Sequence, residues 1–477
     1  MQPSIFNVRV PVPTRNEVFL MNTLTDAQLL VSPDVIDLLD RCDGSDPPHQ
    51  PYTEDERETL TSLAEHGFVV PDRAADRGAL DRYFSSVKND TAELSVTLLT
   101  TLQCNFACDY CFQGDHGDYN KFAEKMSIET ATQVAAWIER QLDAVRPETL
   151  ALTFFGGEPL LNLPVMYYLA ETLCARTQAR GVPMSISVIT NGLLLTTEVV
   201  ERLLPFGLKG VKITLDGDRE THNRMRPLRG GQGTFDRLIE NIRSVAGRCR
   251  VAIGGNFDES SADSFSALLE YLSQQSFADQ LVNVNFKPIV RNDRTPDVAT
   301  LRGKGIVPLL PVNDSGVPLK PLNGTCMSNV GEGSGVGCDS CEFLDDKWSQ
   351  LREQTKRHGF STPDGVHGGP CHVHHVHAHT IGPDGSLYAC PGFTGEKALS
   401  TGHIDGRHDN MRESALERFE RLHPWDECAD CAFIPVCAGG CVVASHTQLG
   451  DMNKPTCHKR SYESALIALA HEVAGAA

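Results

Sequence analysis

The chain has 477 residues, of which 40% are hydrophobic and 22% are charged, and it carries a net charge of −19. This composition is typical of a globular protein and excludes a disordered or collagen-like chain. The negative charge argues against nucleic acid or an anionic membrane as the main partner, because both need a basic footprint. No apolar run reaches the roughly 18 residues of a membrane span, and the N-terminus lacks the layout of a secretion signal.

The first segment, residues 1–88, combines short apolar alternations with helical periods. One helix is expected to begin at Pro33, where proline fits a first turn, and a second helix is expected over 54–65. Strands are expected over 5–12, 18–20 and 68–70. We expect a small winged-helix-like module that recognises a peptide, with a merely structural extension as the alternative.

The second segment, residues 89–290, alternates strand-like and helical runs. Ser127 is expected to cap one of the helices. Repeats of this size imply parallel strands with right-handed crossovers, hence an α/β fold with a full or partial (β/α)6 barrel, and a partial one is the prediction. The six expected strands are Leu94–Leu99, Leu150–Phe155, Met184–Ile189, Val211–Leu215, Arg250–Ile253 and Val282–Phe286.

The remaining chain divides into an insert and a cysteine-rich end. Residues 291–370 are expected to be an irregular bridge, and their Gly331–Gly337 run lacks the Lys-Ser/Thr pair of a phosphate loop. Residues 371–477 are rich in cysteine and are expected to close with an amphipathic helix over 460–475.

Sixteen cysteines are the unusual feature of the composition. Without a secretion signal, metal or cluster ligation is favoured over disulfides. Cys104, Cys108 and Cys111 follow the first barrel strand, where barrel active sites are built. Three thiolates can bind three irons of a four-iron cube and leave the fourth iron open. The alternative is a zinc knuckle or three buried thiols, but three cysteines underfill a structural zinc site.

This Cys-x3-Cys-x2-Cys loop resembles the signature of the radical S-adenosylmethionine (SAM) superfamily. The resemblance implies that SAM chelates the open iron and that reduction of the cluster releases a 5′-deoxyadenosyl radical. Tyr110 occupies the aromatic position near the adenine, and Arg226 matches a position that reaches the SAM carboxylate. Further motif residues end the next strands: Gly156, Gly157 and Glu158, which resemble the motif for the SAM amino group, then Asn191 and Thr214.

The C-terminal cysteines are similar in spacing to the SPASM domain of radical SAM peptide maturases, which holds two auxiliary [4Fe-4S] clusters. The resemblance therefore implies three [4Fe-4S] clusters in all. One auxiliary cluster is assigned Cys371, Cys390 and Cys441. The other is assigned Cys428, Cys431, Cys437 and Cys457. One or two structural zinc ions are the alternative, because Cys-x2-Cys is also a zinc spacing.

The fourth ligand of the first auxiliary cluster stays open. Cys326, Cys338 and Cys341 are candidates, and otherwise a substrate thiolate takes the place. The histidines that follow Cys371 are expected on a half-exposed strand, with His375, His377 and His379 on one face. The isolated Cys42, Cys174 and Cys249 are expected to be free thiols in the core.

The resemblance implies hydrogen-atom abstraction from a ribosomally made precursor peptide with a leader, in a reducing cytoplasm, with flavodoxin or ferredoxin as electron donor and without nucleic acid or membrane partners. The specific prediction is an oxidative cross-link, with a thioether as the first choice; catalytic residues are not assigned. The alternatives are formylglycine formation on a sulfatase, carbon–carbon linkage or epimerisation of a peptide, and a zinc-organised binding scaffold. Pro391 argues against the sulfatase reading, because an aspartate is expected after that cysteine in those enzymes.

Overall fold

The structure is a computed structural model, and it describes residues 1–45, 50–108, 110–111, 123–289, 339–367, 369–407, 417–428 and 430–476. Its N-terminal part contains a three-stranded antiparallel sheet in the order β2-β3-β4. Its elements are β1 (Gln2–Pro3), β2 (Asn7–Val12), β3 (Glu17–Asn22), β4 (Gln28–Val31), α1 (Pro33–Asp40), α2 (Glu54–Glu65), β5 (Val69–Val70) and α3 (Arg73–Lys88).

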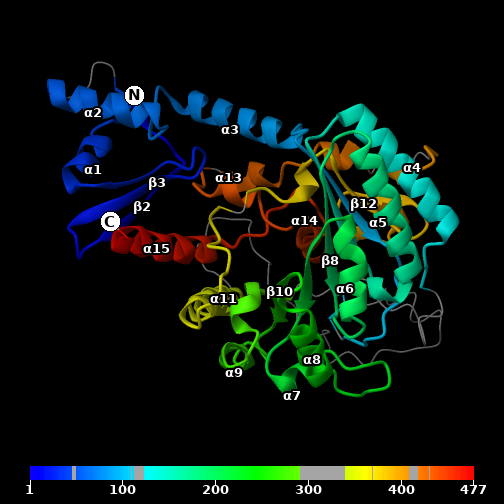
Figure 1. The fold of residues 1–477 in the computed structure, drawn as a ribbon. Helices are drawn as coiled ribbons and strands as arrows, with labels where there is room; N and C mark the ends of the chain where they lie inside the picture. The colour runs from blue at the N-terminus through cyan, green and yellow to red at the C-terminus, as the bar shows by residue number, and fades with distance from the viewer. Residues whose placement is uncertain are drawn as a thin grey trace, which may run out of the picture.

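The two predicted helices of this part are confirmed. Pro33 lies in the first turn of α1, and Thr53 and Glu56 form a reciprocal capping box at the start of α2. The 16-residue helix α3, which leads from this part to the barrel in Figure 1, was not predicted. A winged-helix module is not confirmed, so peptide recognition by this part stays a prediction.

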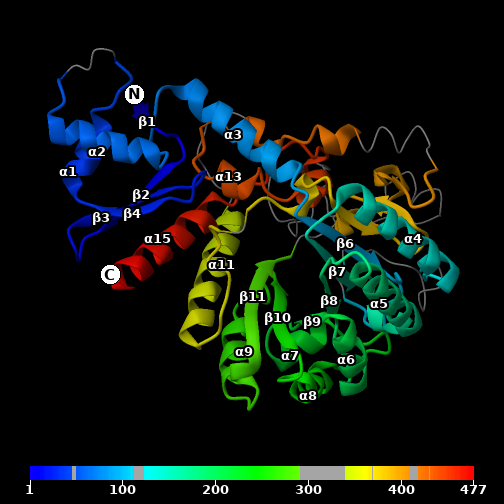
Figure 2. The same cartoon turned by 45° about the horizontal axis from the view of Figure 1, so that its top comes forward.

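Six parallel strands form the central sheet, as predicted (Figure 2). They are β6 (Glu93–Leu99), β7 (Thr149–Phe155), β8 (Met184–Thr190), β9 (Leu208–Thr214), β10 (Arg250–Phe257) and β11 (Leu281–Pro288). They lie in chain order, which is the order of a barrel, and the described sheet ends at β11 without closing. The fold is therefore α/β with a partial (β/α)6 barrel.

Helices cover one face of this sheet and bury the main core. They are α4 (Ile128–Val145), α5 (Leu163–Gln178), α6 (Thr197–Leu203), α7 (Arg219–Met225), α8 (Phe235–Val245) and α9 (Ser264–Ser273). The hydroxyl of Ser127 accepts a hydrogen bond from the Thr130 amide, so the predicted cap of α4 is confirmed. Alternate strand residues, such as Val211 and Ile213, are buried against the helices, which leaves the other strand face to line the inside of the barrel.

The C-terminal region extends the same sheet. Strand β12 (Ala378–Ile381) pairs in parallel with β6, and β13 (Ser386–Tyr388) and β14 (Gly402–His403) follow antiparallel. The predicted strand over the histidines is wrong. Cys371 instead precedes a single 3-10 turn over His372–His374, and pairing with β6 begins only at Ala378.

Two helices connect the parts of the molecule. Helix α11 (Asp339–Arg357) packs against β11, α9 and α15, so this portion of the insert is helical and not irregular as expected. Helix α15 (Lys459–Ala476) confirms the predicted closing helix, and its Leu466 and Ala470 pack against β2 residues (Figure 1). The Gly331–Gly337 run lies outside the described residues.

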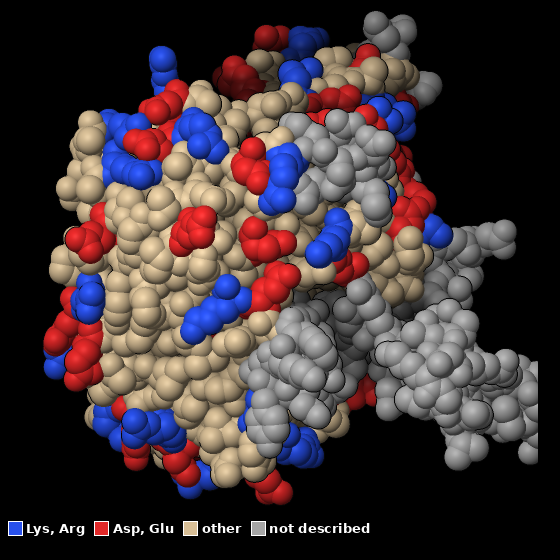
Figure 3. Space-filling view, turned by 90° about the vertical axis from the view of Figure 1, so that its right-hand side faces the viewer, with Lys and Arg blue, Asp and Glu red and all other residues tan. Residues whose placement is uncertain are grey.

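No helix in the described parts of the chain is both long and apolar enough for a membrane span. Figure 3 shows one face of the molecule, where Lys and Arg side chains are interspersed with Asp and Glu and where much of the surface is uncharged.

Candidate functional site

The three-cysteine loop leaves the end of β6 and is held by the glycine motif at the end of β7. The Gly157 amide donates to the Thr101 carbonyl at 2.9 Å, and the Glu158 amide donates to the Gln103 carbonyl at 2.8 Å. A Cβ atom on Gly157 would lie 2.3 Å from the Gln103 carbonyl oxygen. Glycine is therefore required here because two backbones meet without space for a side chain.

The thiols of this loop lie close enough to influence one another. Burial, together with the charges of Glu158, Cys108 and Cys111, raises the pKa of Cys104 to about 12. Cys111 is exposed and Cys108 is half-buried. The raised pKa favours the protonated thiol of Cys104. A bound iron would reverse this preference, because a metal ion favours the thiolate over the thiol.

Glu158 is fully buried and hydrogen-bonded on both oxygens. Its Oε1 accepts from the Thr190 hydroxyl at 2.7 Å, and its Oε2 accepts from the Asn191 amide at 2.8 Å. Burial raises the pKa of Glu158, and this effect outweighs the hydrogen bonds and the charge of Arg226, which lower it. The carboxylate thus joins the ends of β7 and β8, and Oε2 retains a lone pair for an ammonium group.

Asn191 lies directly against the cysteine loop. Its Nδ2 donates to the Asn105 side-chain oxygen at 2.7 Å and lies 3.8 Å from the Cys104 sulfur. Thr214, the predicted residue on β9, ends its strand opposite Gly254 of β10. The predicted motifs therefore meet on one rim of the barrel.

The most polar part of the site is a network around Arg226 and Tyr110. Arg226 Nη1 donates to the Tyr110 hydroxyl at 2.5 Å and lies 3.4 Å from Asp216 Oδ2. The Tyr110 hydroxyl also donates to Asp216, whose Oδ1 accepts from the Asn256 amide at 2.6 Å. Arg226 Nε is buried and has no hydrogen-bond partner among the residues that the structure describes, so an acceptor at this point would complete the guanidinium.

Asp216 and Asn256 were missed as site residues. Asp216 ends the Thr214–Gly217 motif, so a carboxylate just beyond a strand end was the available signal. No comparable pattern marks Asn256. The backbone amide of Asp216 donates a hydrogen bond to Nδ1 of His222 at 3.1 Å, so His222 helps to position Asp216.

The predicted residues of the first auxiliary cluster also come together. Burial, together with the charges of Cys371 and Cys441, raises the pKa of Cys390 to about 12. Strand β13 ends next to Cys390, whereas Cys441 lies more than 50 residues later in the chain, just before α14 (Val442–Ala444). The fold thus gathers three thiols that are remote in sequence.

The predicted residues of the second auxiliary cluster form another group. Burial, together with the charges of Cys437, Cys431 and Cys457, raises the pKa of Cys428 to about 12. Cys428 ends a 3-10 turn, and Cys437 ends α13 (Ile434–Cys437).

Among the described residues, no three His, Cys, Asp or Glu side chains converge as ligands of one metal ion.

The outcomes differ for the cysteines and histidines outside these three cysteine groups. Cys326 and Cys338 lie outside the described residues, as does the side chain of Cys341. Cys42 is buried as expected, whereas Cys174 and Cys249 are partly exposed. His374 and His379 are each packed edge-on against a tryptophan.

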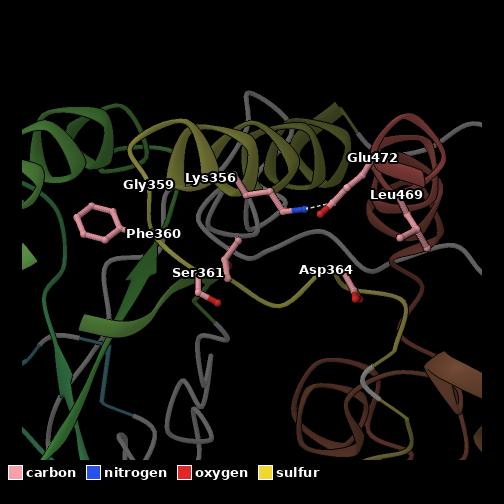
Figure 4. A pocket seen from close by; sticks show the side chains of 8 residues that line it. Lys356, Gly359, Phe360, Ser361, Asp364, Leu469 and Glu472 are labelled. Atoms are coloured by element: carbon pink, nitrogen blue, oxygen red, sulfur yellow. Dashed lines mark hydrogen bonds and ion pairs between the residues drawn. The ribbon is translucent and has the colours of Figure 1, made fainter. Parts of the chain in front are cut away.

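A cavity of about 540 Å³ lies apart from these residues, between the end of α11, the segment 359–364 and α15 (Figure 4). The Lys356–Glu472 ion pair, at 2.7 Å, crosses it. None of its lining residues belongs to the predicted site.

Comparison with known proteins identifies the barrel. Residues 98–256 match the family model "Radical SAM superfamily". These residues span the end of β6 through β10, including the three-cysteine loop, so the chain contains a radical SAM domain.

Curated relatives have diverse activities. The chain is 30% identical to GTP 3′,8-cyclase of Synechococcus over 34% of its length and 44% of the relative. It is 27% identical to sporulation killing factor maturation protein SkfB of Bacillus subtilis, over 44% of its length and 46% of the relative. It therefore spans less than half of these two proteins. It is 24% identical to a serine-type anaerobic sulfatase-maturating enzyme of Klebsiella aerogenes, over 71% of its length and 76% of the relative.

A similar solved structure is that of an enzyme titled "Native anSMEcpe with bound AdoMet". It has a TM-score of 0.55 and 18% sequence identity, and the match covers 80% of this chain and 99% of the other. At this identity the match supports the fold alone.

Proposed function

We propose that this chain, whose residues 98–256 form a radical SAM domain, is a SPASM-type peptide maturase that oxidatively cross-links a precursor peptide, most specifically by a thioether. The observation that carries the proposal is the sorting of ten cysteines into three groups, each with mutual electrostatic influence between its thiols. One group lies at the rim of the barrel and two lie in the C-terminal region, as three [4Fe-4S] clusters require.

The residues at the rim fit SAM and its cluster. Cys104, Cys108 and Cys111 would hold the cluster, and the unpartnered Nε of Arg226 suits the SAM carboxylate. Glu158 would accept the SAM ammonium, and Tyr110 would lie near the adenine. When bound, the cluster and SAM together supply the radical that abstracts a hydrogen atom; the protein supplies positioning and exclusion of water.

The C-terminal cysteines would hold two auxiliary clusters, and these clusters would supply an electron acceptor for oxidation of the substrate. Cys428, Cys431, Cys437 and Cys457 provide a full set of four ligands. Cys371, Cys390 and Cys441 provide three, and a substrate thiolate in the fourth position would place a cysteine sulfur beside the carbon it attacks. This fourth position, for which Cys326, Cys338 and Cys341 are the other candidates, is the reason to prefer a thioether.

The N-terminal sheet would hold the leader of the peptide. Strand β4 pairs with β3 on one side and with no strand on the other within the described residues. An extended leader segment can add to such an edge through main-chain hydrogen bonds. Helix α15 packs on one face of this sheet, against apolar side chains of β2 and β3.

Formylglycine formation on a sulfatase is the second candidate, favoured by the 76% coverage of the Klebsiella aerogenes enzyme. Against it stands Pro391, which follows Cys390 and carries no acid or base. Both candidate functions would need a flavodoxin or ferredoxin to reduce the cluster at the rim.

The test is mass spectrometry of a Cys-containing precursor peptide encoded beside this gene, after anaerobic reaction with enzyme, SAM and reductant. The proposal expects a loss of two hydrogens and the disappearance of one alkylatable thiol. Cys111→Ala is the matched inactive control. An unchanged mass, or conversion of a sulfatase peptide to formylglycine instead, would refute the cross-linking proposal.

A further inference from the structure

The N-terminal part, residues 1–88, packs directly on the loop Cys428–Cys437, which contains three of the four cysteines assigned to the second auxiliary cluster. Within this loop the Cys431 amide donates to the Cys428 carbonyl at 3.2 Å, and the Cys437 amide donates to the Phe433 carbonyl at 2.8 Å. Helix α3 lies against α13, the helix that ends the loop, as Figures 1 and 2 both show. The contact therefore joins segments from opposite ends of the chain.

Two side-chain hydroxyls of the N-terminal part donate hydrogen bonds to the backbone of the loop. Thr23, which directly follows β3, donates to the carbonyl of Ala432, the residue after the second cysteine of the loop. Tyr83 of α3 donates to the Pro435 carbonyl at 3.1 Å. The Thr23 hydroxyl also lies 3.4 Å from the Phe6 carbonyl, and Thr23 is buried. A buried carbonyl that loses such a donor is costly, so these bonds help to fix the loop.

Apolar side chains of the two segments share buried clusters. Cys428 and Cys431 pack at the edge of one cluster, and Cys431 and Cys437 pack at the edge of another. The first cluster joins Phe6, Leu80 and Phe84 to Trp425, Ile434 and Ala438, and the second joins Val8, Val10, Val12, Phe19 and Met21 to Phe433. The thiols of the loop thus lie beside a core that the N-terminal part completes.

This packing affects the surroundings of a cluster at the loop. Solvent exposure and the hydrogen bonds around its ligands are among the factors that set the properties of an iron–sulfur cluster. If the N-terminal part moved away, the apolar side chains of Phe433 and Ile434, each 4% exposed, would lose their cover. Water would then reach the backbone and the thiols of the loop more easily.

We propose that the N-terminal part shields the second auxiliary cluster, and that Thr23 is a positioning residue that holds the Cys428–Cys437 loop in place. The inference rests on the proposed function, because it takes a cluster to be bound at this loop. It gives the N-terminal part a second role beside peptide recognition. The two roles are linked in the structure, since β3 leads to Thr23 and pairs with β4, the strand whose edge would receive the leader.

The test uses four variants of the full chain. Thr23→Val removes the hydroxyl and keeps the branched shape of the side chain, whereas Thr23→Ser keeps the hydroxyl. Tyr83→Phe removes the second hydrogen bond to the loop. Thr25→Val is the matched control, because the Thr25 hydroxyl donates to the His66 carbonyl within the N-terminal part, at 2.9 Å.

The anaerobically reconstituted holoenzyme is incubated with the iron chelator bathophenanthroline disulfonate for timed intervals. A short pulse of iodoacetamide then alkylates the cysteines that have lost their iron, and mass spectrometry measures the label on each cysteine. Cys104 and Cys108 at the rim of the barrel serve as the internal control.

We expect Cys431 and Cys437 to be labelled about 3- to 10-fold faster in Thr23→Val and in Tyr83→Phe than in the wild type. The reason is that local opening of the loop becomes easier when one hydrogen bond is lost. Thr23→Ser and Thr25→Val should match the wild type, and the rim cysteines should be labelled at one rate in all the proteins.

Equal labelling of Cys431 and Cys437 in Thr23→Val and in the wild type would overturn the inference. An equal acceleration at Cys104 would also overturn it, because the substitution would then act through general stability and not through the loop. Failure of the proposed function would appear in the wild type itself, where Cys431 and Cys437 would be labelled before any chelator is added.

Discussion

Arg226 and Tyr110 are joined by a hydrogen bond of 2.5 Å although 116 residues separate them in the chain. The bond connects the three-cysteine loop to the residue that ends α7. The buried Nε of Arg226 has no hydrogen-bond partner in the described parts of the chain, although the rest of the guanidinium is positioned by Tyr110 and Asp216. A ligand carboxylate would complete it.

Arg226→Ala is therefore expected to weaken SAM binding about 10- to 100-fold, because a charge-assisted hydrogen bond is lost. Calorimetric titration with SAM measures the effect. Arg224→Ala, two residues away and exposed, is the matched control and should bind SAM normally. Iron content should be unchanged in both variants; unaltered SAM affinity in Arg226→Ala would show that this guanidinium has another role.

Gly157→Ala should prevent assembly of the rim cluster. The new methyl group would collide with the Gln103 carbonyl, so the cysteine loop must move, at a cost of roughly 1–3 kcal/mol or more. Iron per chain and the thermal unfolding temperature are the measurements. Gly475→Ala in α15, where a Cβ atom meets nothing within 4 Å, should leave both unchanged or raise stability slightly. Normal iron content in Gly157→Ala would contradict the packing account.

The strands of the barrel could be predicted because each carries apolar residues at alternate or neighbouring positions, which are buried against the helices. The rim motifs were predictable for the same reason, since residues that follow such strands meet at one edge. Asn256 could not be found in this way, because its role depends on the hydrogen bond that its amide donates to Asp216.

The errors have a common physical cause. The histidines after Cys371 alternate as a strand would, but Cys371 and Cys390 must approach Cys441, and the chain turns at His372–His374 instead. Helix α3 has a weakly apolar pattern, so it is stabilised mainly by tertiary contacts. One of these is the stacking of Phe84 on Trp425, whose ring centroids lie 3.8 Å apart. Local periodicity does not report such contacts.

His222 should make the protein sensitive to acid. Burial, with a smaller effect of the Arg226 charge, lowers the pKa of His222 to about 3. Its Nδ1 accepts the Asp216 amide, and its Nε2 lies 3.1 Å from the Thr234 hydroxyl. The folded state holds His222 in its neutral form. The contribution of His222 to the free energy of unfolding is therefore complete above about pH 6.5. It is lost as the pH falls below that value, by about 1.4 kcal/mol per pH unit.

The measurement is the thermal unfolding temperature of the anaerobic protein between pH 7.5 and pH 5.5. The wild-type temperature should fall over this range, and that of His222→Gln, which cannot be protonated, should fall less. Parallel curves for the two proteins would mean that His222 does not contribute to the acid sensitivity.

His367 connects the N-terminal sheet to the segment before Cys371. Its Nδ1 lies 2.7 Å from Asp364, and its Nε2 lies 3.0 Å from Asp26, between β3 and β4. Burial lowers the pKa of His367, but the two carboxylates outweigh it and the net shift is upward. The bridge is therefore fully formed below about pH 6.5 and is lost as the pH rises through the folded-state pKa.

His367→Gln should speed amide exchange in β4 relative to the wild type at pH 6, and the difference should vanish at pH 9. Comparing the two proteins at each pH removes the intrinsic pH dependence of exchange. His66→Gln, exposed on the same N-terminal part, should have no effect on β4. A difference that persists at pH 9 would mean that His367 acts through packing and not through its charge.

The central claim is that this chain uses three iron–sulfur clusters to generate and then oxidise a substrate radical. The most direct test is iron and labile sulfide per chain after anaerobic reconstitution, together with release of 5′-deoxyadenosine from SAM under dithionite. The account predicts about 12 irons, three cubes of four, with 5′-deoxyadenosine produced. A zinc-loaded protein that leaves SAM intact would contradict it.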